Sequence, residues 1–193
     1  MTLLLADRDH PARALLERTV REVFLSEYGA HVPAFPRRLL ACLDASGQPL
    51  AVAGLRFAED GFFSAAYLDG GTEAALSAAI GRPVAAHQIV EFSSLAATRP
   101  GAAMPLVGAA IRLCLGAGCA YGLFTATHRL RALLRRAGLV CVDLGAARPE
   151  RLPDASVWGS YYLHDPRVLA VSADTLAGLR RAATLAAPER LHA

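Results

Sequence analysis

The stretch of sequence that decides the fold runs through residues 88–126 and reads QIVEFSSLAATRPGAAMPLVGAAIRLCLGAGCAYGLFTA. Residues 88–96 are mainly apolar and end before a Pro-Gly cluster, which predicts a central strand. Residues 104–115 have helical spacing and stop at a Gly-Ala-Gly sequence, and residues 119–126 predict a second buried strand. Strand, helix and strand in this order require a crossover connection, which predicts the mixed α/β class.

The chain on either side of this core adds more strands and helices. Two apolar runs separated by a Gly- and Pro-containing turn, at residues 38–43 and 50–57, predict a β-hairpin. Thr72 is placed to cap one of the helices. The remaining expected strands lie at residues 1–6, 62–68, 139–144 and 161–171, and the expected helices at residues 11–27, 72–80, 128–137 and 174–185. We therefore predict one α/β (α+β) domain over residues 1–186, with a mixed central sheet flanked by helices, and a flexible tail at residues 187–193.

Composition excludes several classes of protein. The chain has 193 residues, of which 54% are hydrophobic and 19% charged, and this balance is typical of a folded domain rather than a disordered chain or a coiled coil. No window contains the roughly 20 uninterrupted apolar residues that a membrane-spanning helix needs. The apolar start lacks a basic segment and a cleavage site, so it predicts a strand and not a signal peptide. The net charge of +3 is too small to indicate nucleic-acid binding by itself, and we predict no DNA partner.

Four cysteines, Cys42, Cys114, Cys119 and Cys141, lie in apolar stretches. They form no CxxC pair and have no neighbouring His at ligand spacing, so neither a metal site nor a disulfide framework is indicated. We predict buried, reduced thiols and a cytoplasmic setting.

Glu91 places a carboxylate inside the otherwise apolar central strand. An ionised group there is costly unless it is paired or hydrogen-bonded. Two interpretations stay open at this point. Glu91 is either a general base with a raised pKa that acts on an amine, or a structural partner for a buried Arg or for backbone amides at a sheet bulge.

Hydroxyl and imidazole side chains near the ends of the two core strands are candidate substrate contacts. Ser93 and Ser94 lie in the first strand, but no Gly-x-Ser-x-Gly sequence surrounds them, which argues against a serine hydrolase. Thr125, Thr127 and His128 lie where the second strand ends and a helix begins, a place where side chains face ligands in α/β sheets. Thr127 can equally be a helix cap, and His128 an exposed residue of the first turn.

The sequence WGSYY at residues 158–162 is the densest aromatic group of the chain. A tyrosine hydroxyl there can protonate a leaving group. Adjacent side chains of a strand point to opposite faces, so at most one of Tyr161 and Tyr162 faces a cleft, and His164 shares the face of Tyr162. Trp158 and His164 join the candidate substrate contacts, although aromatic side chains in a strand also simply pack.

The helix expected at residues 128–137 carries four arginines and no acidic residue. Arg129, Arg131, Arg135 and Arg136 form either a solvated face or a surface for a phosphorylated carrier, a coenzyme or RNA, since Arg pairs bidentately with phosphate. We take Arg129, Arg131 and Arg135 as candidate donor contacts.

A series of short motifs in this chain resembles the thermostable hemolysin family. The motifs follow one another in order between about residues 20 and 172. That family is in turn similar to the GNAT acyltransferase superfamily, especially to its acyl-homoserine lactone synthase branch, so the resemblance implies a GNAT-like fold built on the strand–helix–strand core. The motifs are FLSEYGA (residues 24–30), GLR (54–56), YLD (67–69), IVEFSSLA (89–96), FTAT (124–127), Leu130 with Gly138-Leu139, and WGSYY (158–162).

The resemblance also implies a site. It implies a V-shaped opening between the two core strands, in which an acyl donor meets backbone amides and an amine attacks its carbonyl carbon. Glu91 falls on the family's strand glutamate and would be the base. Tyr162 or Tyr161 falls on its aromatic pair and would protonate the leaving group. The family usually has Gly-Asn where this chain has Ser93 and Ser94, so a different choice of substrate is expected.

The loop before the core helix departs from the pattern of coenzyme-A-binding members. Such members carry Arg/Gln-x-x-Gly-x-Gly/Ala, whose amides hold the pyrophosphate. Here Arg99 is followed by Pro100, Gly101 and Ala102, so the spacing is one residue shorter and the proline removes an amide donor. Arg99, Gly101 and Ala102 remain candidate donor contacts, and the change favours a carrier-linked donor beside acyl-CoA.

The resemblance therefore predicts an N-acyltransferase with no tightly bound cofactor. It would move an acyl or aminoacyl group from acyl-CoA, acyl carrier protein or aminoacyl-tRNA to the amine of a small molecule in a biosynthetic or signalling pathway. Two other hypotheses stay open: a non-catalytic GNAT-like module that binds a carrier or ligand, and a membrane-lytic protein, as the family name suggests. The lack of a secretion signal and of a long amphipathic helix with aromatic anchors argues against the lytic hypothesis.

Overall fold

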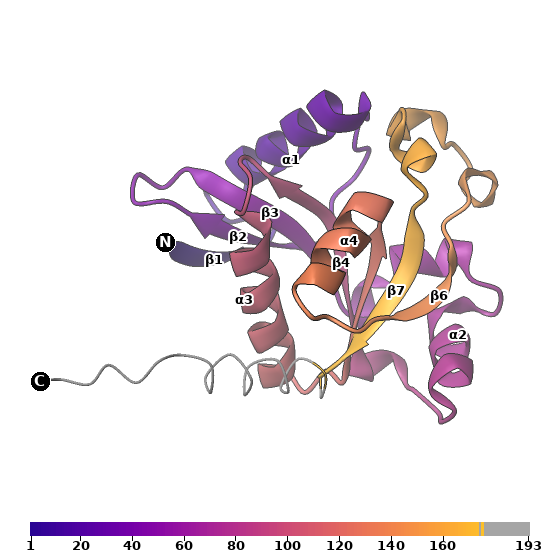
Figure 1. The fold of residues 1–193 in the computed structure, drawn as a ribbon. Coiled ribbons are helices and arrows are strands. Elements are labelled where there is room, and N and C mark those ends of the chain that lie inside the picture. The colour runs from indigo at the N-terminus through magenta and orange to yellow at the C-terminus, as the bar shows by residue number, and fades with distance from the viewer. Residues whose placement is uncertain (174, 176–193) are drawn as a thin grey trace, which may run out of the picture.

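A seven-stranded mixed sheet runs through the centre of the molecule (Figure 1). The computed structural model describes residues 1–173 and 175. Its strands are β1 (Thr2–Ala6), β2 (Arg38–Leu43), β3 (Pro49–Arg56), β4 (Ile89–Ala97), β5 (Tyr121–Ala126), β6 (Val142–Ala146) and β7 (Arg167–Ser172). Their order in the sheet is β1-β2-β3-β4-β5-β7-β6. β4 and β5 pair in parallel, and the other neighbouring strands pair antiparallel.

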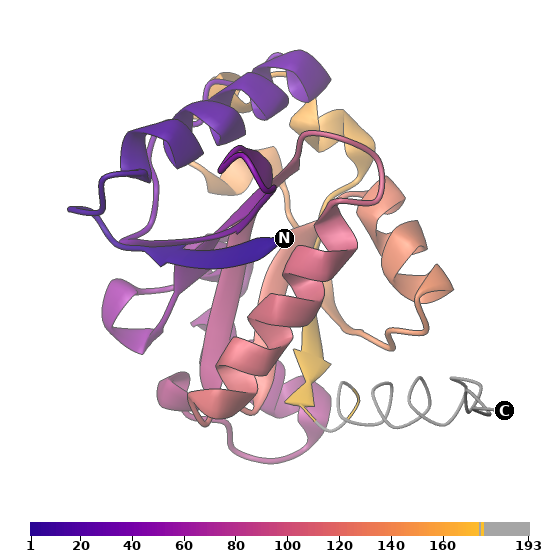
Figure 2. The same cartoon turned by 90° about the vertical axis from the view of Figure 1, so that its left-hand side faces the viewer.

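Within the described residues, four α-helices cover the two faces of this sheet. They are α1 (Arg13–Tyr28) and α2 (Gly71–Ile80) on one face, and α3 (Ala103–Gly116) and α4 (His128–Arg136) on the other. Figure 2 shows α3 lying along the sheet while α1 crosses above it. The crossover between β4 and β5 passes through α3, which confirms the predicted mixed α/β class.

Alternation along the strands decides which helix each side chain meets. On β2, Leu39 packs against α1 on one face, and Leu40 packs against α3 on the other. The helices meet these residues with fully buried side chains, Leu16 and Val20 from α1 and Leu106 from α3. The inner strands are therefore covered on both sides, which explains why they read as nearly continuous apolar runs, while the edge strand β1 leaves Leu3 and Leu5 exposed.

β4 and β5 stay together along only part of their length. Pairing runs from Ile89 opposite Tyr121 to Phe92 opposite Phe124. Beyond this point β4 continues beside β3, and β5 continues beside β7. The two central strands therefore part after Phe92 and Phe124, which is the V-shaped opening that the family resemblance implies.

A bulge on β4 lies at the start of this opening. Ser93 pairs with Gly54 and Ala96 with Val52, so two residues of β4 face one residue of β3. Ser94, inside the bulge, has a left-handed φ of 50°. The bulge leaves backbone groups of β4 without ladder partners beside the opening.

Two predicted strands are wrong in part. Residues 62–68, predicted to be extended, contain the 3-10 helix η2 (Phe63–Tyr67), because the first amides of this turn bind a carboxylate on β4. The strand predicted at residues 161–171 is divided. Its first part is the 3-10 helix η6 (Tyr161–His164), which ends at Asp165 in a left-handed conformation, and β7 begins only at Arg167.

The division changes the predicted directions of the side chains on η6. Tyr161 and His164 both contact the ring of Tyr28, while the hydroxyl of Tyr162 bonds to Tyr67. His164 therefore lies on the side of Tyr161. The prediction that it shares the face of Tyr162 is wrong. The reason is the 3-10 period of three residues per turn, which brings residues i and i+3 together.

Several element ends also differ from the prediction. α2 begins at Gly71 after the left-handed Gly70, so Thr72 lies inside the helix and is not its cap. α1 begins at Arg13, two residues beyond the predicted start. β6 begins at Val142, three residues later than predicted.

The last predicted elements lie outside the described residues. These are the helix at residues 174–185 and the tail at residues 187–193, together with the domain boundary at residue 186. No α-helix of the described part is long and apolar enough to cross a membrane.

The cysteines lie mostly in the interior. Cys42, Cys114 and Cys119 are buried, as predicted, whereas Cys141 is only half-buried. Burial raises the pKa of the Cys114 thiol to about 12, which keeps this thiol protonated and unreactive at neutral pH.

Candidate active site

A cavity of about 540 Å³ opens where β4 and β5 part. β4 lines it from Glu91 onward, and α1 with the loop at residues 33–36 forms one side. α4 and the loop that precedes α3 form the other side. The aromatic residues of the WGSYY segment complete its wall. The cavity therefore lies at the same end of the two central strands as the β4 bulge.

Glu91 is a buried carboxylate in the wall of this cavity, with only 1% of its surface exposed. Its Oε2 accepts a 2.6 Å hydrogen bond from the backbone N–H of Phe63. Its Oε1 accepts bonds from the backbone N–H of Ser64 at 2.8 Å and from the Ser64 hydroxyl at 2.5 Å. The group that stabilises this carboxylate is thus the first turn of η2, and not a salt bridge to a buried Arg.

The environment of Glu91 shifts its proton affinity. Burial raises the pKa of Glu91 above its ordinary value of 4.5, while the bonds from Ser64 and Phe63 and the charge of Arg56 oppose that rise. Because the Ser64 hydroxyl donates to Glu91, it accepts from the Thr125 hydroxyl, which lies 3.0 Å away. A carboxyl group whose pKa is raised toward neutral pH can both take up and release a proton at that pH.

Two tyrosine hydroxyls meet in the wall of the cavity. The hydroxyls of Tyr67 and Tyr162 lie 2.6 Å apart, and burial raises the pKa of both groups, so both stay protonated. The bond to Tyr67 opposes the rise at Tyr162, and either hydroxyl can be its donor. Tyr161 is engaged elsewhere, because its hydroxyl donates to the Thr125 carbonyl at 3.5 Å.

The WGSYY segment is attached to the end of α1. The backbone N–H and the hydroxyl of Ser160 both donate to the Tyr28 carbonyl, at 2.8 and 3.1 Å. The N–H of His31 donates to the Val157 carbonyl at 2.6 Å. Gly159, with a φ of 53°, approaches so closely that a Cβ there would overlap the Tyr28 carbonyl oxygen. These contacts hold the aromatic wall of the cavity against α1.

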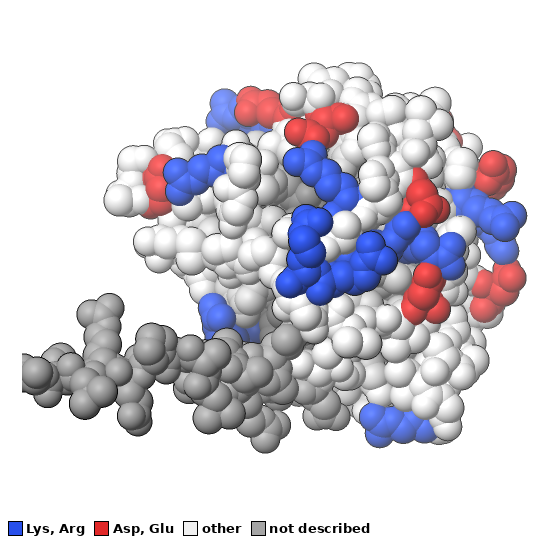
Figure 3. All heavy atoms as spheres, viewed as in Figure 1, with Lys and Arg blue, Asp and Glu red and all other residues white. Residues whose placement is uncertain are grey.

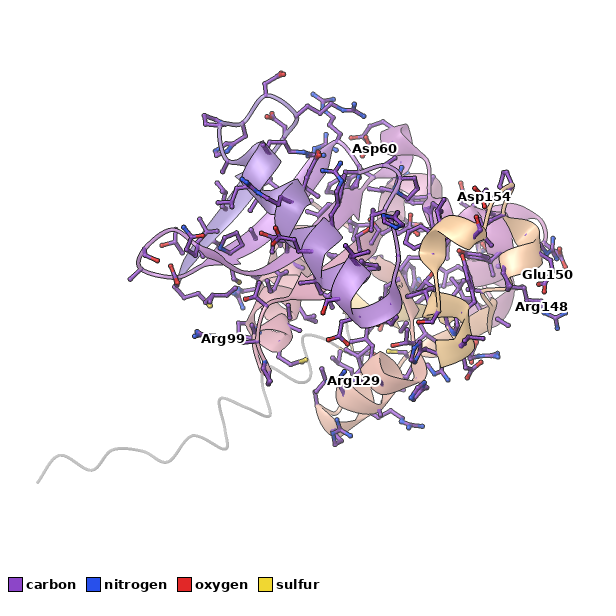
Figure 4. All side chains as sticks on the ribbon, turned by 90° about the horizontal axis from the view of Figure 1, so that it is seen from above. Asp60, Arg99, Arg129, Arg148, Glu150 and Asp154 are labelled. Carbon is purple, nitrogen blue, oxygen red and sulfur yellow. The ribbon has the colours of Figure 1, made fainter. Side chains whose placement is uncertain are left out.

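Basic side chains gather on the α4 side of the cavity. Figure 3 shows arginines clustered over α4, and Figure 4 shows Arg99 beside the N-terminal end of α3 and Arg129 on α4. Arg99, Arg129 and Arg136 line the cavity. Arg129 is 82% exposed and pairs with Glu27 at 3.5 Å, a surface pair that contributes little to stability. These guanidinium groups are available to a phosphate.

The structure brings most of the predicted site residues together. The predicted residues that line the cavity are Glu91, Ser93, Ser94, Arg99, Gly101, Thr125, Thr127, Arg129, Trp158, Tyr161 and Tyr162. Thr127 also caps α4, because its hydroxyl accepts a 3.5 Å bond from the Leu130 N–H. The capping interpretation of Thr127 is therefore confirmed beside its position in the cavity wall.

Three predicted contacts of the loop and histidine groups lie outside the cavity wall. Ala102 is buried in the core beneath α3. His128 and His164 stack on each other with ring centroids 5.8 Å apart, and His128 Nδ1 lies 3.1 Å from the His164 carbonyl. The two histidines therefore pack on each other outside the cavity wall, and His128 is an exposed residue of the first turn of α4.

Two predicted donor contacts on α4 also lie elsewhere. Arg131 donates to the carboxylate and carbonyl of Asp165 and to the Ala126 carbonyl, so its guanidinium holds η6 and β5 together. Arg135 is outside the cavity wall, and the next residue, Arg136, lines it instead. The helical period of 3.6 residues places Arg129 and Arg136, two turns apart, on one face.

Sequence reasoning missed several residues of the site. Tyr28, Arg56 and Tyr67 all line the cavity. They belong to the FLSEYGA, GLR and YLD motifs, so the family resemblance is the signal that could have identified them. Phe63 and Ser64 had no signal, because nothing in residues 62–68 indicates that their amides turn toward Glu91.

Comparisons with solved structures support the fold. TofI in a ternary complex with an inhibitor and MTA is similar with a TM-score of 0.62 and 16% identity, over 93% of this chain and 97% of that chain. MesI, a CoA-dependent acyl-homoserine lactone synthase, has a TM-score of 0.57 and 18% identity, over 97% of each chain. FeeM, an N-acyl amino acid synthase from uncultured soil microbes, has a TM-score of 0.57 and 12% identity, over 91% of this chain and 98% of that chain.

These likenesses confirm the GNAT-like fold that the sequence predicts. No curated protein sequence matches the chain significantly. The family model described as thermostable hemolysin matches residues 6–176, which is most of the chain. On this match, and with the strand opening and buried glutamate in the expected places, the chain belongs to the thermostable hemolysin family.

Proposed function

We propose that this protein is an N-acyltransferase that uses Glu91 as its general base. The observation that carries the proposal is the buried carboxylate in the wall of a cavity, at the point where β4 and β5 part. A cavity-lining carboxylate whose pKa is raised by burial suits a general base at neutral pH. The names of similar structures, which include acyl-homoserine lactone synthases and an N-acyl amino acid synthase, support the same class of reaction.

In the proposed step, the acceptor amine attacks the carbonyl carbon of a thioester or ester. A new C–N amide bond forms, and the C–S or C–O bond of the donor breaks. Glu91 takes the proton that the amine nitrogen loses, and Tyr162 gives its proton to the departing thiolate or alkoxide. Glu91 then releases its proton to water, and Tyr162 regains one from water.

Backbone groups of β4 are our candidates for stabilising the reacting carbonyl. Negative charge develops on this oxygen during the attack, and preorganised N–H donors stabilise such charge. The bulge at Ser94 leaves backbone groups without ladder partners beside the cavity, which supports this role.

We further propose that the donor is a phosphorylated carrier and the acceptor a small molecule. Arg99, Gly101, Arg129 and Arg136 line the α4 side of the cavity, where they can meet the phosphates of acyl-CoA, of acyl carrier protein or of aminoacyl-tRNA. Pro100 weakens the usual pyrophosphate loop, which favours a donor held by side chains. A cavity of about 540 Å³ is the size of a small-molecule site.

Donor consumption tests the proposal. The purified protein is incubated with an acyl-CoA, an acyl carrier protein or an aminoacyl-tRNA pool, each with a panel of amines, and products are weighed by mass spectrometry. We expect one donor class to be consumed and an amide of the matching mass to accumulate. Retention of a donor without turnover, across all three classes, would contradict the transferase proposal and favour the binding module.

Ser64→Ala tests the hydrogen bond that holds Glu91. The Ser64 hydroxyl donates to ionised Glu91 at 2.5 Å and thereby lowers the pKa of that carboxyl. Without this bond the pKa of Glu91 rises further, so we expect the acid limb of the kcat/KM profile to move to higher pH. Ser46→Ala, in the exposed turn between β2 and β3, is the control and should leave the limb in place. An acid limb that does not move in Ser64→Ala would contradict the role of Glu91 as base.

A further inference from the structure

Arg56 is a charged residue of the cavity wall that the proposed step does not use. It ends β3, and the antiparallel register places its Cα opposite that of Glu91. Residues directly opposite each other in an antiparallel pair project from the same face, with Cβ atoms about 5 Å apart. The guanidinium of Arg56 and the carboxylate of Glu91 therefore share one region of the cavity.

The protein leaves one edge of the Arg56 guanidinium without a partner. Nη1 donates to the Asp60 carbonyl at 3.5 Å. Nε is buried and has no hydrogen-bond partner, and Nη2 makes no hydrogen bond within the described residues. Nε and Nη2 together form the side-on edge with which an Arg binds a carboxylate through two parallel bonds.

The neighbouring carboxylates are already bound by other groups. Asp60 and Glu59 both accept hydrogen bonds from Arg38, at 3.2 and 3.0 Å. Glu91 directs both of its oxygens at η2. In the part of the chain that the structure describes, Arg56 consequently makes no salt bridge, although its charge lies in a half-buried position.

A second unpartnered polar atom lies on the same face of the sheet. Ser93 Oγ is buried without a partner, and Ser93 pairs with Gly54, two residues before Arg56 on β3. Buried polar side chains are normally hydrogen-bonded, so such exceptions point to a hydrogen-bond partner that is not part of the protein chain. Of the three exceptions among the described residues, Arg56 and Ser93 belong to the cavity wall on β3 and β4, and only Thr72 belongs to α2.

We infer that the acceptor amine carries a carboxylate, which binds the Nε–Nη2 edge of Arg56 while the amine lies beside Glu91. The inference rests on the proposed function for the fate of the amine. An amino acid fits this arrangement, because its amine and carboxylate are a few bonds apart and the two protein groups are cross-strand neighbours.

The test uses matched pairs of acceptors, each an amino acid and its carboxamide. The two members share the amine and side chain and differ in the charge at one end. We expect the wild type to use the acid with a kcat/KM at least about 10-fold higher than the carboxamide, as a charge-assisted hydrogen bond implies. Arg56→Gln should lower this ratio about 10-fold, and Arg56→Lys should restore it in part, because Lys keeps the charge but not the fork.

The ratio makes the test independent of indirect effects. Any influence of the substitution on Glu91 or on the folded fraction acts on both acceptors and cancels. Arg148→Gln is the matched control, since Arg148 is exposed and lies outside the cavity wall (Figure 4). Its ratio should equal that of the wild type.

Binding is measured separately, by ligand-observed NMR with the same pairs, so that a failure of transfer is distinguishable from a failure of the inference. If no amine is acylated but the acids bind wild type and not Arg56→Gln, the inference stands and the proposed function fails. Equal binding of acids and carboxamides, or a preference that survives Arg56→Gln, overturns the inference. An effect of Arg56→Gln on the KM of the donor alone overturns it as well, because Arg56 would then serve the donor.

Discussion

Glu91→Gln is expected to lower kcat at neutral pH by about 100- to 10,000-fold, the usual contribution of a positioned general base. Gln has the size of Glu but cannot take a proton from the attacking amine. The measurement is the initial rate of donor consumption, with the donor and acceptor identified in the mass-spectrometric assay. Glu73→Gln, on α2 and outside the cavity wall, is the matched control and should keep the wild-type rate.

The same variant should stay folded, because two effects on stability oppose each other. Gln offers one carbonyl oxygen, so the amide of Phe63 or of Ser64 loses its acceptor, at a cost of about 1–3 kcal/mol. Against this, Gln removes a buried charge. A Glu91→Gln protein that is folded and fully active would contradict the role of Glu91 as base, and one that is merely unfolded would make Glu91 a structural residue.

The difference in stability between the wild type and Glu91→Gln should depend on pH. Because burial raises the pKa of Glu91, folding favours its neutral form relative to the unfolded chain. The resulting stability is fully present below the ordinary pKa of 4.5 and is lost as the pH rises through the raised folded-state value. Gln does not ionise, so the Tm of the wild type relative to Glu91→Gln should fall with rising pH.

Gly159→Ala is expected to lower the free energy of unfolding by about 3 kcal/mol or more, which for a domain of this size lowers the Tm by roughly 10 °C. A Cβ at Gly159 would overlap the Tyr28 carbonyl oxygen and lie 2.8 Å from the carbonyl carbon of Gly29. The residue also has a φ of 53°, which an alanine adopts only with strain. Thermal unfolding followed by circular dichroism measures the effect.

Gly61→Ala separates the overlap from the strain. Gly61 has a φ of 66°, but a Cβ there has no heavy atom within 4 Å. Only the backbone strain acts at this position, where ψ is 156°, so we expect a loss of about 1–3 kcal/mol. We also expect activity to survive in Gly61→Ala and to fall in Gly159→Ala at temperatures where both are folded, since only Gly159 carries the aromatic wall. Equal Tm values for the two variants would contradict the close approach of Gly159 to α1.

The strand–helix–strand core could be predicted because its signals are local. Residues 88–126 contain apolar runs, a Pro-Gly stop and a Gly-Ala-Gly stop, and β4, α3 and β5 lie where these indicate. The η2 turn could not be predicted in this way. Its conformation is fixed by Glu91, whose carboxylate binds amides 27 and 28 residues away in the chain, and apolar residues such as Phe62 and Phe63 are typical of strands.

The site was predictable where a residue was unusual for its place, as Glu91 is in an apolar strand. Arg56 was missed because an arginine is common at the end of a hairpin strand. Only the structure shows that part of its guanidinium has no hydrogen-bond partner. Tyr161 and Tyr162 were predicted as a pair, but their division of roles depends on the 3-10 turn, which places one against the Thr125 carbonyl and the other against Tyr67. The rings of His128 and His164 stack on each other, and the spacing of the two residues in the sequence does not reveal this contact.

The bond between the Ser160 hydroxyl and the Tyr28 carbonyl joins residues 132 positions apart. Contacts of this separation require a long loop to close, which costs conformational entropy. During synthesis α1 leaves the ribosome well before the WGSYY segment, so a nascent chain that already contains Glu91 and Ser64 still lacks the aromatic wall of the cavity. A chain truncated before residue 155 would also lack β7, which lies between β5 and β6, so we expect it to have neither the complete sheet nor the enclosed cavity.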